Sequence, residues 1–303
     1  MIRGFHVDDP GLLSTVQDLG RPHAAASGVP AGGAMDRFAH IAANVLVEND
    51  RSAATLECTW SGPSLVAEQR CVVAITGADL DPRVNGTEAP MWTSVELDEG
   101  DRLSFGHRRG GVRTYVAVRG GFGGDRWLGS LSTNLMTGRG GVHGRGLATG
   151  DVLTVGESEW AATPGRTLAG DWRPRYEDHT LYAIAGPHEA AGLFDSAFAV
   201  SHDSNRMGYR LEGPTLRSPT VEILSFALVA GAVQLPSGGQ PILLMADHQT
   251  AGGYPVVAVV VSASMPVAAQ LAPGDELRIV ETSIEEALRQ RSAQRSWLDS
   301  LTS

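Results

Sequence analysis

Short runs of apolar and β-branched residues, each ending at glycine or proline, recur along the chain and constrain its fold more than any other feature. Clear examples are VRTYVAVRGG, TLYAIAGP and YPVVAVVVS. Such runs bounded by turn residues are typical of β-strands, and 37 glycines and 16 prolines supply turns throughout. We therefore predict a mainly β protein, mostly antiparallel and folded as barrels or sandwiches, with few helices.

One turn pattern occurs three times along the chain. At 100–105, 150–155 and 274–279, a Gly-Asp pair precedes a strand-like segment. In each segment, a leucine and a later apolar residue are two positions apart. Because alternate residues of a strand share a face, this leucine and the later Phe, Val or Ile point to the same side. The pattern predicts the same turn-to-strand unit in both halves of the chain.

Two helices are expected. Asp36 is placed to cap a helix over 37–49, in which apolar residues recur at helical spacing. Ser283 and Glu286 form a capping box before a second helix over 284–298.

The chain is long enough to form two domains. It has 303 residues, of which 42% are hydrophobic, so each half can bury a core. A polar, turn-rich segment without clear periodicity separates two β-rich halves. We predict a first domain at 1–160, a linker at 161–178 and a second domain at 179–303.

Charge and composition exclude several classes of function. The formal net charge of −10 disfavours nucleic-acid binding, which needs a basic face. All 24 basic residues counted as Lys or Arg are arginines. Without lysine the chain has no lysine-containing phosphate-binding loop and cannot carry covalent biotin. Any anion that it binds must be met by arginine or backbone N–H groups.

Metal binding and membrane insertion are not expected either. The sequence has no HExxH motif and no paired set of Cys and His. Cys58 and Cys71 lack CxxC spacing and are interpreted as core residues in a reducing compartment. No secretory signal is visible, and the longest apolar stretches fall short of the roughly 20 residues that span a bilayer. We expect a cytoplasmic protein.

Polar residues gather in four segments that could carry chemistry. The first places Asp18 and Arg21 in a glycine-bounded turn, with further glycines before Asp36. A structural Asp–Arg pair that holds this loop is the favoured interpretation. The second segment, at 127–146, offers Ser132 and neighbouring hydroxyl groups before a glycine-rich tail. A surface loop is favoured there over a phosphate site.

The third candidate segment, at 201–213, has Arg206 and Arg210 on either side of Tyr209. Arginine suits a carboxylate or phosphate, and the tyrosine ring could form a wall of the site. A solvated strand edge would have the same composition, so the residues alone leave both interpretations open.

The fourth candidate segment carries the densest polar cluster, at the two ends of the apolar run PILLMA. Asp247 is a candidate general base or acceptor for an amide N–H, and His248 is a candidate proton shuttle. Adjacent strand residues point to opposite faces, so we favour Asp247 over His248. The other polar residues at these ends are Gln234, Gln249, Thr250 and Tyr254.

In order along the chain, six motifs resemble the series of one family. They are GLLSTVQDLGRPHAAASGVPAGGAMD, LECTWSGPSL, LGSLSTNL, SNRMGYRLEG, GAVQLPSGGQPILLMADHQTAGGYP and AQLAPGDELRI. The family is allophanate hydrolase subunit 2, also called biotin-dependent carboxyltransferase-like. It includes the C subunit of 5-oxoprolinase and the antagonist of the kinase inhibitor KipI. The similarity extends from Gly11 to about Ile279.

The resemblance implies a fold of two cyclophilin-like β-barrels and a role inside a complex. Family members act with a KipI-like B subunit, and in 5-oxoprolinase with a third, A subunit, to cleave 5-oxo-L-proline to L-glutamate using ATP. ATP is therefore expected at the level of the complex. In related urea carboxylases the corresponding region belongs to a carboxyltransferase module that receives biotin.

The resemblance also implies roles around a small lactam or ureido substrate. Asp247 would accept the lactam N–H, Arg206 and Arg21 would hold anions, and Tyr254 would wall the pocket. We take Asp247, Arg206 and Tyr254 as candidate catalytic residues. The candidate substrate-binding residues are Asp18, Arg21, Asp36, Ser132, Tyr209, Gln234, Gln249, Thr250, Gly252 and Gly253.

One position departs from the family pattern. Where the family often has Ala-Asp-Leu, this chain has Ala263-Ser264-Met265 and lacks a carboxylate. Serine can replace that acid if it caps a turn, but not if it binds substrate. Two alternatives to 5-oxoprolinase stay open: a carboxyltransferase subunit of the allophanate hydrolase or urea carboxylase type, and a non-enzymatic antagonist of a KipI-like inhibitor.

Overall fold

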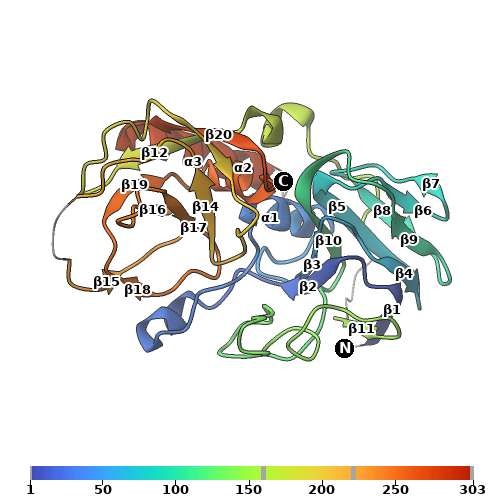
Figure 1. Cartoon of the computed structure of the whole chain (residues 1–303). Coiled ribbons are helices and arrows are strands. Elements are labelled where there is room, and N and C mark those ends of the chain that lie inside the picture. Colours follow the sequence, from blue (N-terminus) through green and yellow to red (C-terminus); the bar gives the residue numbers. More distant parts are fainter. Residues whose placement is uncertain (1, 158–161, 220–222, 301–303) are drawn as a thin grey trace. The chain divides into compact units, whose positions relative to one another are not determined.

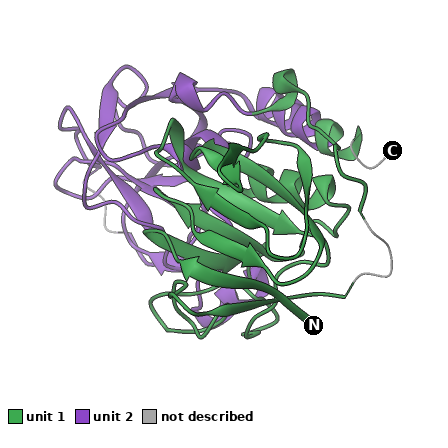
Figure 2. Cartoon of the chain, turned by 90° about the vertical axis from the view of Figure 1, so that its right-hand side faces the viewer, with its two compact units in different colours: residues 1–20, 36–173, 296–303 green, residues 21–35, 174–295 purple. Residues whose placement is uncertain are grey.

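The chain divides into two compact units, each described separately below (Figures 1 and 2). The computed structural model describes residues 2–157, 162–219 and 223–300. The first unit comprises residues 1–20, 36–173 and 296–303, and the second comprises residues 21–35 and 174–295. The second unit therefore includes a short segment from the first half of the chain. The predicted domain boundaries near 160 and 179 stay predictions.

Two open sheets form the first unit. The first sheet has the strand order β11-β1-β4-β9-β6-β7, and the second has the order β2-β3-β10-β5-β8. The first contains β1 (Ile2–Asp9), β4 (Ser64–Ala67), β6 (Pro82–Val84), β7 (Thr87–Glu88), β9 (Arg102–Phe105) and β11 (Val152–Val155). The second contains β2 (Leu13–Gln17), β3 (Thr55–Thr59), β5 (Cys71–Asp79), β8 (Ser94–Leu97) and β10 (Gly110–Val118).

Alternation along the strands gives the second sheet two different faces. Cys58 and Val116 lie in the apolar core of the unit. Glu57 and Tyr115, one position away, point to the opposite face and are also buried. Helix α1 (Arg37–Leu46) contacts this polar face through its own side chains and backbone. The first unit thus buries a polar layer in addition to its apolar core.

The expected caps of both predicted helices are present. Asp36 accepts a hydrogen bond from Ala39 N at 2.9 Å and caps α1, which ends at Leu46. The helix is shorter than predicted because Glu48 has a φ of 58° in the left-handed region. Helix α3 (Ile284–Ser300) begins after Ser283, whose Oγ accepts from the backbone N of Glu286.

The sequence gives no clear signal for the remaining short helical elements. They are α2 (Met265–Gln270) and three 3₁₀ turns, η1 (Pro22–Ser27), η2 (Gly170–Trp172) and η3 (Tyr176–Asp178). In the described part of the chain, every helix is too short or too polar to cross a membrane.

A closed barrel forms most of the second unit. Its strand order is β12-β19-β16-β17-β14-β13-β20. One pair, β12 with β20, is parallel, and the other neighbouring pairs are antiparallel. The strands are β12 (Thr180–Ala185), β13 (Ala197–Val200), β14 (Gly208–Glu212), β16 (Ala232–Gln234), β17 (Ile242–Leu244), β19 (Val256–Val260) and β20 (Glu276–Glu281).

Two further features complete the second unit. The strands β15 (Phe226–Ala227) and β18 (Ala251–Gly252) pair as a separate two-stranded ribbon. Met35, from the segment 21–35, is part of the apolar cluster that fills the barrel. This segment is therefore held by barrel residues although it comes from the first half of the sequence.

The structure confirms part of the predicted fold and corrects another part. The chain is mainly β with few helices, and the second unit contains a barrel. The first unit has no closed barrel among its described strands, because its two sheets end at β11 and β7 and at β2 and β8. The predicted first barrel is replaced by two open sheets.

The three Gly-Asp turns share one geometry. Their glycines have φ values of 88°, 89° and 89°, in the left-handed region that favours glycine (Gly100, Gly150, Gly274). Each aspartate accepts a hydrogen bond at 2.8 Å from a backbone N three residues before it (Asp101, Asp151, Asp275). The leucine that follows is buried in each case (Leu103, Leu153, Leu277).

Candidate functional site

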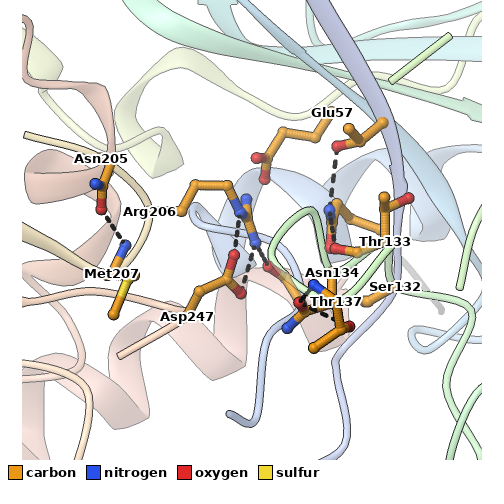
Figure 3. Close-up of polar contacts among 12 residues, drawn as sticks. Glu57, Ser132, Thr133, Asn134, Thr137, Asn205, Arg206, Met207 and Asp247 are labelled. Carbon is orange, nitrogen blue, oxygen red and sulfur yellow. Dashed lines mark hydrogen bonds and ion pairs between the residues drawn. The ribbon is translucent and has the colours of Figure 1, made fainter. Parts of the chain in front are cut away.

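Arg206 and Asp247 form a nearly buried ion pair in the second unit (Figure 3). Arg206 Nε donates to Asp247 Oδ2 at 2.8 Å, and Nη2 donates to Oδ1 at 3.3 Å. The side chains are only 11% and 9% exposed, respectively. Nη2 also donates to the carbonyl oxygen of Gly33 at 2.7 Å. The pair brings the third and fourth candidate segments together and ties both to the segment 21–35.

Arg21 and Asp247 meet at Gly32. A Cβ added to Gly32 would lie 3.0 Å from Arg21 Nη1 and 3.4 Å from Asp247 Oδ1. The φ of Gly32 is 65°, and its backbone N donates to the carbonyl oxygen of Ala246. A guanidinium donor and a carboxylate acceptor beside one glycine can bind an amide, whose N–H and C=O need one acceptor and one donor. The sequence places Asp247 more than 200 positions away from Arg21 and Gly32, and the structure brings the three residues together.

A second polar cluster joins Gln234, Gln249 and Gly252. Gln249 Nε2 donates to Gln234 Oε1 at 3.1 Å. A Cβ added to Gly252 would lie 3.2 Å from Gln234 Nε2 and 3.7 Å from Gln249 Nε2. The last residues of β16 and β18 therefore lie close together.

The remaining candidate residues of the second unit are not part of these two polar clusters. Tyr209 is 2% exposed and part of the barrel core, because the alternation in β14 turns it inward. Tyr254 is 51% exposed at the surface. The carbonyl oxygen of Thr250 accepts from Leu228 N, and His248 Nδ1 lies 2.6 Å from the carbonyl oxygen of Gln249. Gly253 is exposed. The ligand-binding roles of these residues stay predictions.

In the first unit, Asp18 is the centre of a buried hydrogen-bond network. Its Oδ1 accepts from the hydroxyls of Ser130 and Ser132 at 2.6 Å each and from Gly20 N at 2.7 Å. Its Oδ2 accepts from Leu131 N at 2.7 Å. Burial alone would raise the pKa of Asp18, but these hydrogen bonds outweigh it and hold the pKa below its ordinary value. Asp18 is therefore ionised and anchors the loop that carries Ser132.

Asp18 also lines a cavity of the first unit with a volume of about 770 Å³. Seven glycines contribute to the wall of this cavity, and Asp125, Arg126 and His143 stand at exposed positions along it. Several of the glycines are required by close backbone contacts: a Cβ on Gly124 would lie 2.6 Å from the carbonyl oxygen of Gly141. Packing of the chain therefore explains much of the glycine-rich wall.

Asp36 belongs to a polar chain beneath α1. Its backbone N donates to the hydroxyl of Tyr115 at 2.7 Å, and that hydroxyl donates to Glu57 Oε2 at 2.7 Å. All three residues are at most 1% exposed. Burial, and then the neighbouring carboxylate of Glu57, raises the pKa of Tyr115 well above its ordinary value. The tyrosine thus stays protonated and can keep donating to Glu57.

Sequence reasoning misses this polar chain, although a signal exists. In TLECT, polar residues occupy alternate positions, which is typical of a solvent-facing strand side. Here α1 covers that side: His40 Nδ1 lies 2.9 Å from Thr55 Oγ1, and the rings of His40 and Tyr115 pack edge to face at 6.4 Å between centroids. The apolar stripe of the helix predicts a partner surface but does not indicate which one.

Ser264, at the position that departs from the family pattern, does not cap with its side chain. It precedes α2, and its Oγ accepts a hydrogen bond from Tyr182 N at 3.1 Å. Ser264 is 4% exposed. It therefore acts as a buried link between α2 and β12. Within the described ranges, His, Cys, Asp and Glu residues form no group of three or more that could hold a metal ion.

Comparison with known proteins gives a consistent family. The family model described as "Carboxyltransferase domain, subdomain A and B" matches residues 27–281. The chain is 37% identical to the C subunit of 5-oxoprolinase from Escherichia coli (strain K12), over 96% of this chain and 95% of that protein. It is 31% identical to the C subunit of 5-oxoprolinase from Haemophilus influenzae, over 95% and 94%.

A solved structure supports the same assignment. The urea carboxylase of Kluyveromyces lactis superposes with a TM-score of 0.92 at 28% identity, covering 99% of this chain. The chain spans 29% of that larger protein. The relatives are enzymes or enzyme subunits by name. This chain belongs to the carboxyltransferase domain family with subdomains A and B.

Proposed function

We propose that this chain is the C subunit of an ATP-dependent 5-oxoprolinase, which opens 5-oxo-L-proline to L-glutamate in the cytoplasm. The observation that carries the proposal is the 37% identity to the C subunit of 5-oxoprolinase from Escherichia coli, which extends over nearly the whole of both chains. A division into two domains with a linker at 161–178 remains part of this proposal.

The cluster at Gly32 supplies the chemistry that this role needs. The lactam of 5-oxoproline presents one N–H and one C=O. Asp247 accepts the N–H and fixes the ring, while Arg21 and Arg206 stabilise the oxygen as negative charge develops on it. Tyr254 closes the outer side of the bound ring. Asp247 and Arg21 approach the same glycine, which supports these roles.

ATP does not fit the described residues of this chain well. The sequence has no lysine. Arg145, which follows the glycine-rich segment, is already paired with Asp151. We therefore assign ATP, which supplies the free energy for opening an unreactive amide, to a partner protein of the complex.

Partners are part of the proposal: a KipI-like B subunit and a third, A subunit. The test is release of L-glutamate from 5-oxo-L-proline and ATP by the three co-expressed proteins, with mixtures that each lack one of them as controls. Release only from the complete mixture is expected. Release from a mixture without this chain would contradict the proposal.

A carboxyltransferase role is the second candidate, favoured by the TM-score of 0.92 to a urea carboxylase. In that case the Gly32 cluster binds a ureido group, which also presents N–H and C=O. A complex that is inactive on 5-oxo-L-proline but transfers carboxyl from carboxybiotin to urea would support this alternative. A complex that forms and has neither activity would favour the regulatory antagonist.

A further inference from the structure

The side chain of Gln234 is buried with one polar atom unsatisfied. Gln234 ends β16 and is 1% exposed. Its Oε1 accepts from Gln249 Nε2, whereas its Nε2 has no hydrogen-bond partner among the described residues. A donor removed from water without an acceptor destabilises the folded state, so such atoms are rare in proteins. This donor therefore calls for an acceptor that the chain itself does not supply.

The hydrogen bond from Gln249 occupies the oxygen of the Gln234 amide. Gln249 donates through Nε2, and only the oxygen of Gln234 can accept. The NH₂ group of Gln234 is consequently turned away from Gln249 Nε2. It lies 3.2 Å from the position that a Cβ of Gly252 would occupy. The unsatisfied donor faces the place where a side chain is missing.

The conformation of Gly252 does not require glycine. Its φ lies outside the left-handed region, unlike that of most glycines in the chain. A Cβ there would lie 2.9 Å from Leu228 Cδ1, the end of a flexible side chain. It would also lie 3.2 Å from the donor, so the glycine lets Leu228 and the donor pack closely, and an acceptor can reach the donor only if Leu228 or the ribbon moves.

The ribbon that carries Gly252 is small. Gly252 belongs to β18, which pairs with β15 through two residue pairs, followed by one hydrogen bond from Leu228 N to the carbonyl oxygen of Thr250. Isolated two-stranded ribbons are marginally stable. This ribbon can therefore open to admit a ligand at lower cost than any strand of the closed barrel.

We propose that Gln234 Nε2 donates a hydrogen bond to an acceptor oxygen of a bound cyclic amide, the ring carbonyl or the carboxylate. Gln249 is a positioning residue that keeps the NH₂ group of Gln234 directed toward the ligand. The β15–β18 ribbon closes over the bound oxygen. The identity of the amide as 5-oxo-L-proline rests on the proposed function.

Binding to the assembled complex without ATP tests the proposal by calorimetry. The probes are 5-oxo-L-proline, L-proline, which lacks the ring carbonyl, and the cyclic urea 2-imidazolidinone. Gln234→Met removes the donor, and Gly252→Ala places a methyl group against it. Each variant should weaken binding of 5-oxo-L-proline about tenfold, the loss of one hydrogen bond worth about 1.4 kcal/mol. Gly238→Ala is the matched control, because nothing lies within 4 Å of its Cβ position.

Gln249→Glu separates a positioning role from a structural one. A carboxylate at 249 accepts only, so Gln234 turns its NH₂ group toward it and presents oxygen to the ligand. The hydrogen bond between the two residues survives, and the unfolding midpoint should stay within about 2 °C of wild type. Affinity for 5-oxo-L-proline should nevertheless fall about tenfold, with KM raised and kcat kept. Unchanged affinity in Gln249→Glu and Gln234→Met would show that the glutamine pair is structural and overturn the proposal.

The outcomes for the two proposals differ. If the wild-type complex releases no glutamate but binds 5-oxo-L-proline or 2-imidazolidinone through Gln234, the inference stands and the 5-oxoprolinase proposal fails. If the complex releases glutamate and the variants bind as wild type does, the inference fails alone. Absence of binding of every probe to the wild-type complex overturns the inference.

Discussion

Arg206 Nε and Asp247 Oδ2 lie 2.8 Å apart, and both side chains are almost completely removed from solvent. A third contact, from Arg206 Nη2 to the carbonyl oxygen of Gly33, joins this pair to a segment 173 residues away in the sequence. The backbone pairs as well, because Asp247 N donates to the carbonyl oxygen of Arg206. The charges are therefore held in a defined position, which a site that orients an amide requires.

Asp247→Asn should affect both stability and activity. It keeps the shape of the side chain but leaves the Arg206 charge without its counter-charge, at a cost of roughly 3 kcal/mol in the free energy of unfolding. Glutamate release by the complex should be lost. The double variant Arg206→Met/Asp247→Leu should recover most of the stability but none of the activity. Urea denaturation and the glutamate assay measure the two effects, and full activity of Asp247→Asn would remove Asp247 from the mechanism.

Tyr115→Phe should destabilise the first unit. The hydroxyl both donates to Glu57 and accepts from Asp36 N, so its removal takes one buried hydrogen bond from each of these groups. We expect a loss of about 2 kcal/mol in the free energy of unfolding. Tyr182→Phe is the control, because that side chain is 39% exposed. Equal denaturation midpoints for the two variants would contradict the role given to the Tyr115 hydroxyl.

His40 should make stability depend on pH between about 4 and 6.5. Burial lowers the pKa of His40 to about 4, whereas its ordinary value is 6.5. In this window the unfolded chain binds the extra proton, so this contribution is present above pH 6.5 and is lost as the pH falls toward 4. The slope is about 1.4 kcal/mol per pH unit for one proton.

Denaturation of His40→Gln at several pH values checks this dependence. The variant should show a shallower loss of stability between pH 6.5 and 4.5 than the wild type. Asp18 adds little in this window, because its pKa lies below 3.8. His23→Gln, at an exposed position, should keep the wild-type slope. Parallel curves for all three proteins would show that His40 is not the group responsible.

Gly274→Ala should cost about 1 kcal/mol through backbone conformation alone. Nothing lies within 4 Å of the added Cβ, but the φ of Gly274 is 89°. Gly238→Ala also adds a Cβ in open space and has no positive φ. The difference between the two thermal midpoints therefore measures the cost of holding alanine at a positive φ. Equal thermal midpoints for the two variants would show that the turn at Gly274 tolerates alanine.

Features with local causes are predictable from the sequence. The Asp36 cap, the Ser283 cap and the Gly-Asp turns depend on residues within four positions of one another, and the structure contains all of them. Closure of a sheet depends instead on which distant strands pair. Barrel closure requires the parallel pair of β12 and β20, whose residues are nearly one hundred positions apart, and no local pattern indicates it.

In the candidate site, too, local features are predictable from the sequence and contacts between distant residues are not. Asp247 and Arg206 are recognisable as polar residues beside apolar runs, but their pairing is not. Tyr209 lies in the core because Gly208 starts a strand whose alternation turns it inward. Glu57 and Tyr115 escape notice because alternating polar residues usually face water, and here a helix covers them. Burial by a distant segment is the information that the sequence pattern lacks.

The Gly-Asp turn at residues 100, 150 and 274 gives the chain three independent starting points for folding. Each turn closes a hydrogen bond across three residues and directs a leucine into a core. Closing so short a loop costs little entropy and takes place in well under a microsecond. Two of these starting points lie in the first unit and one in the second. Each unit therefore contains at least one turn that can form without any residue of the other unit.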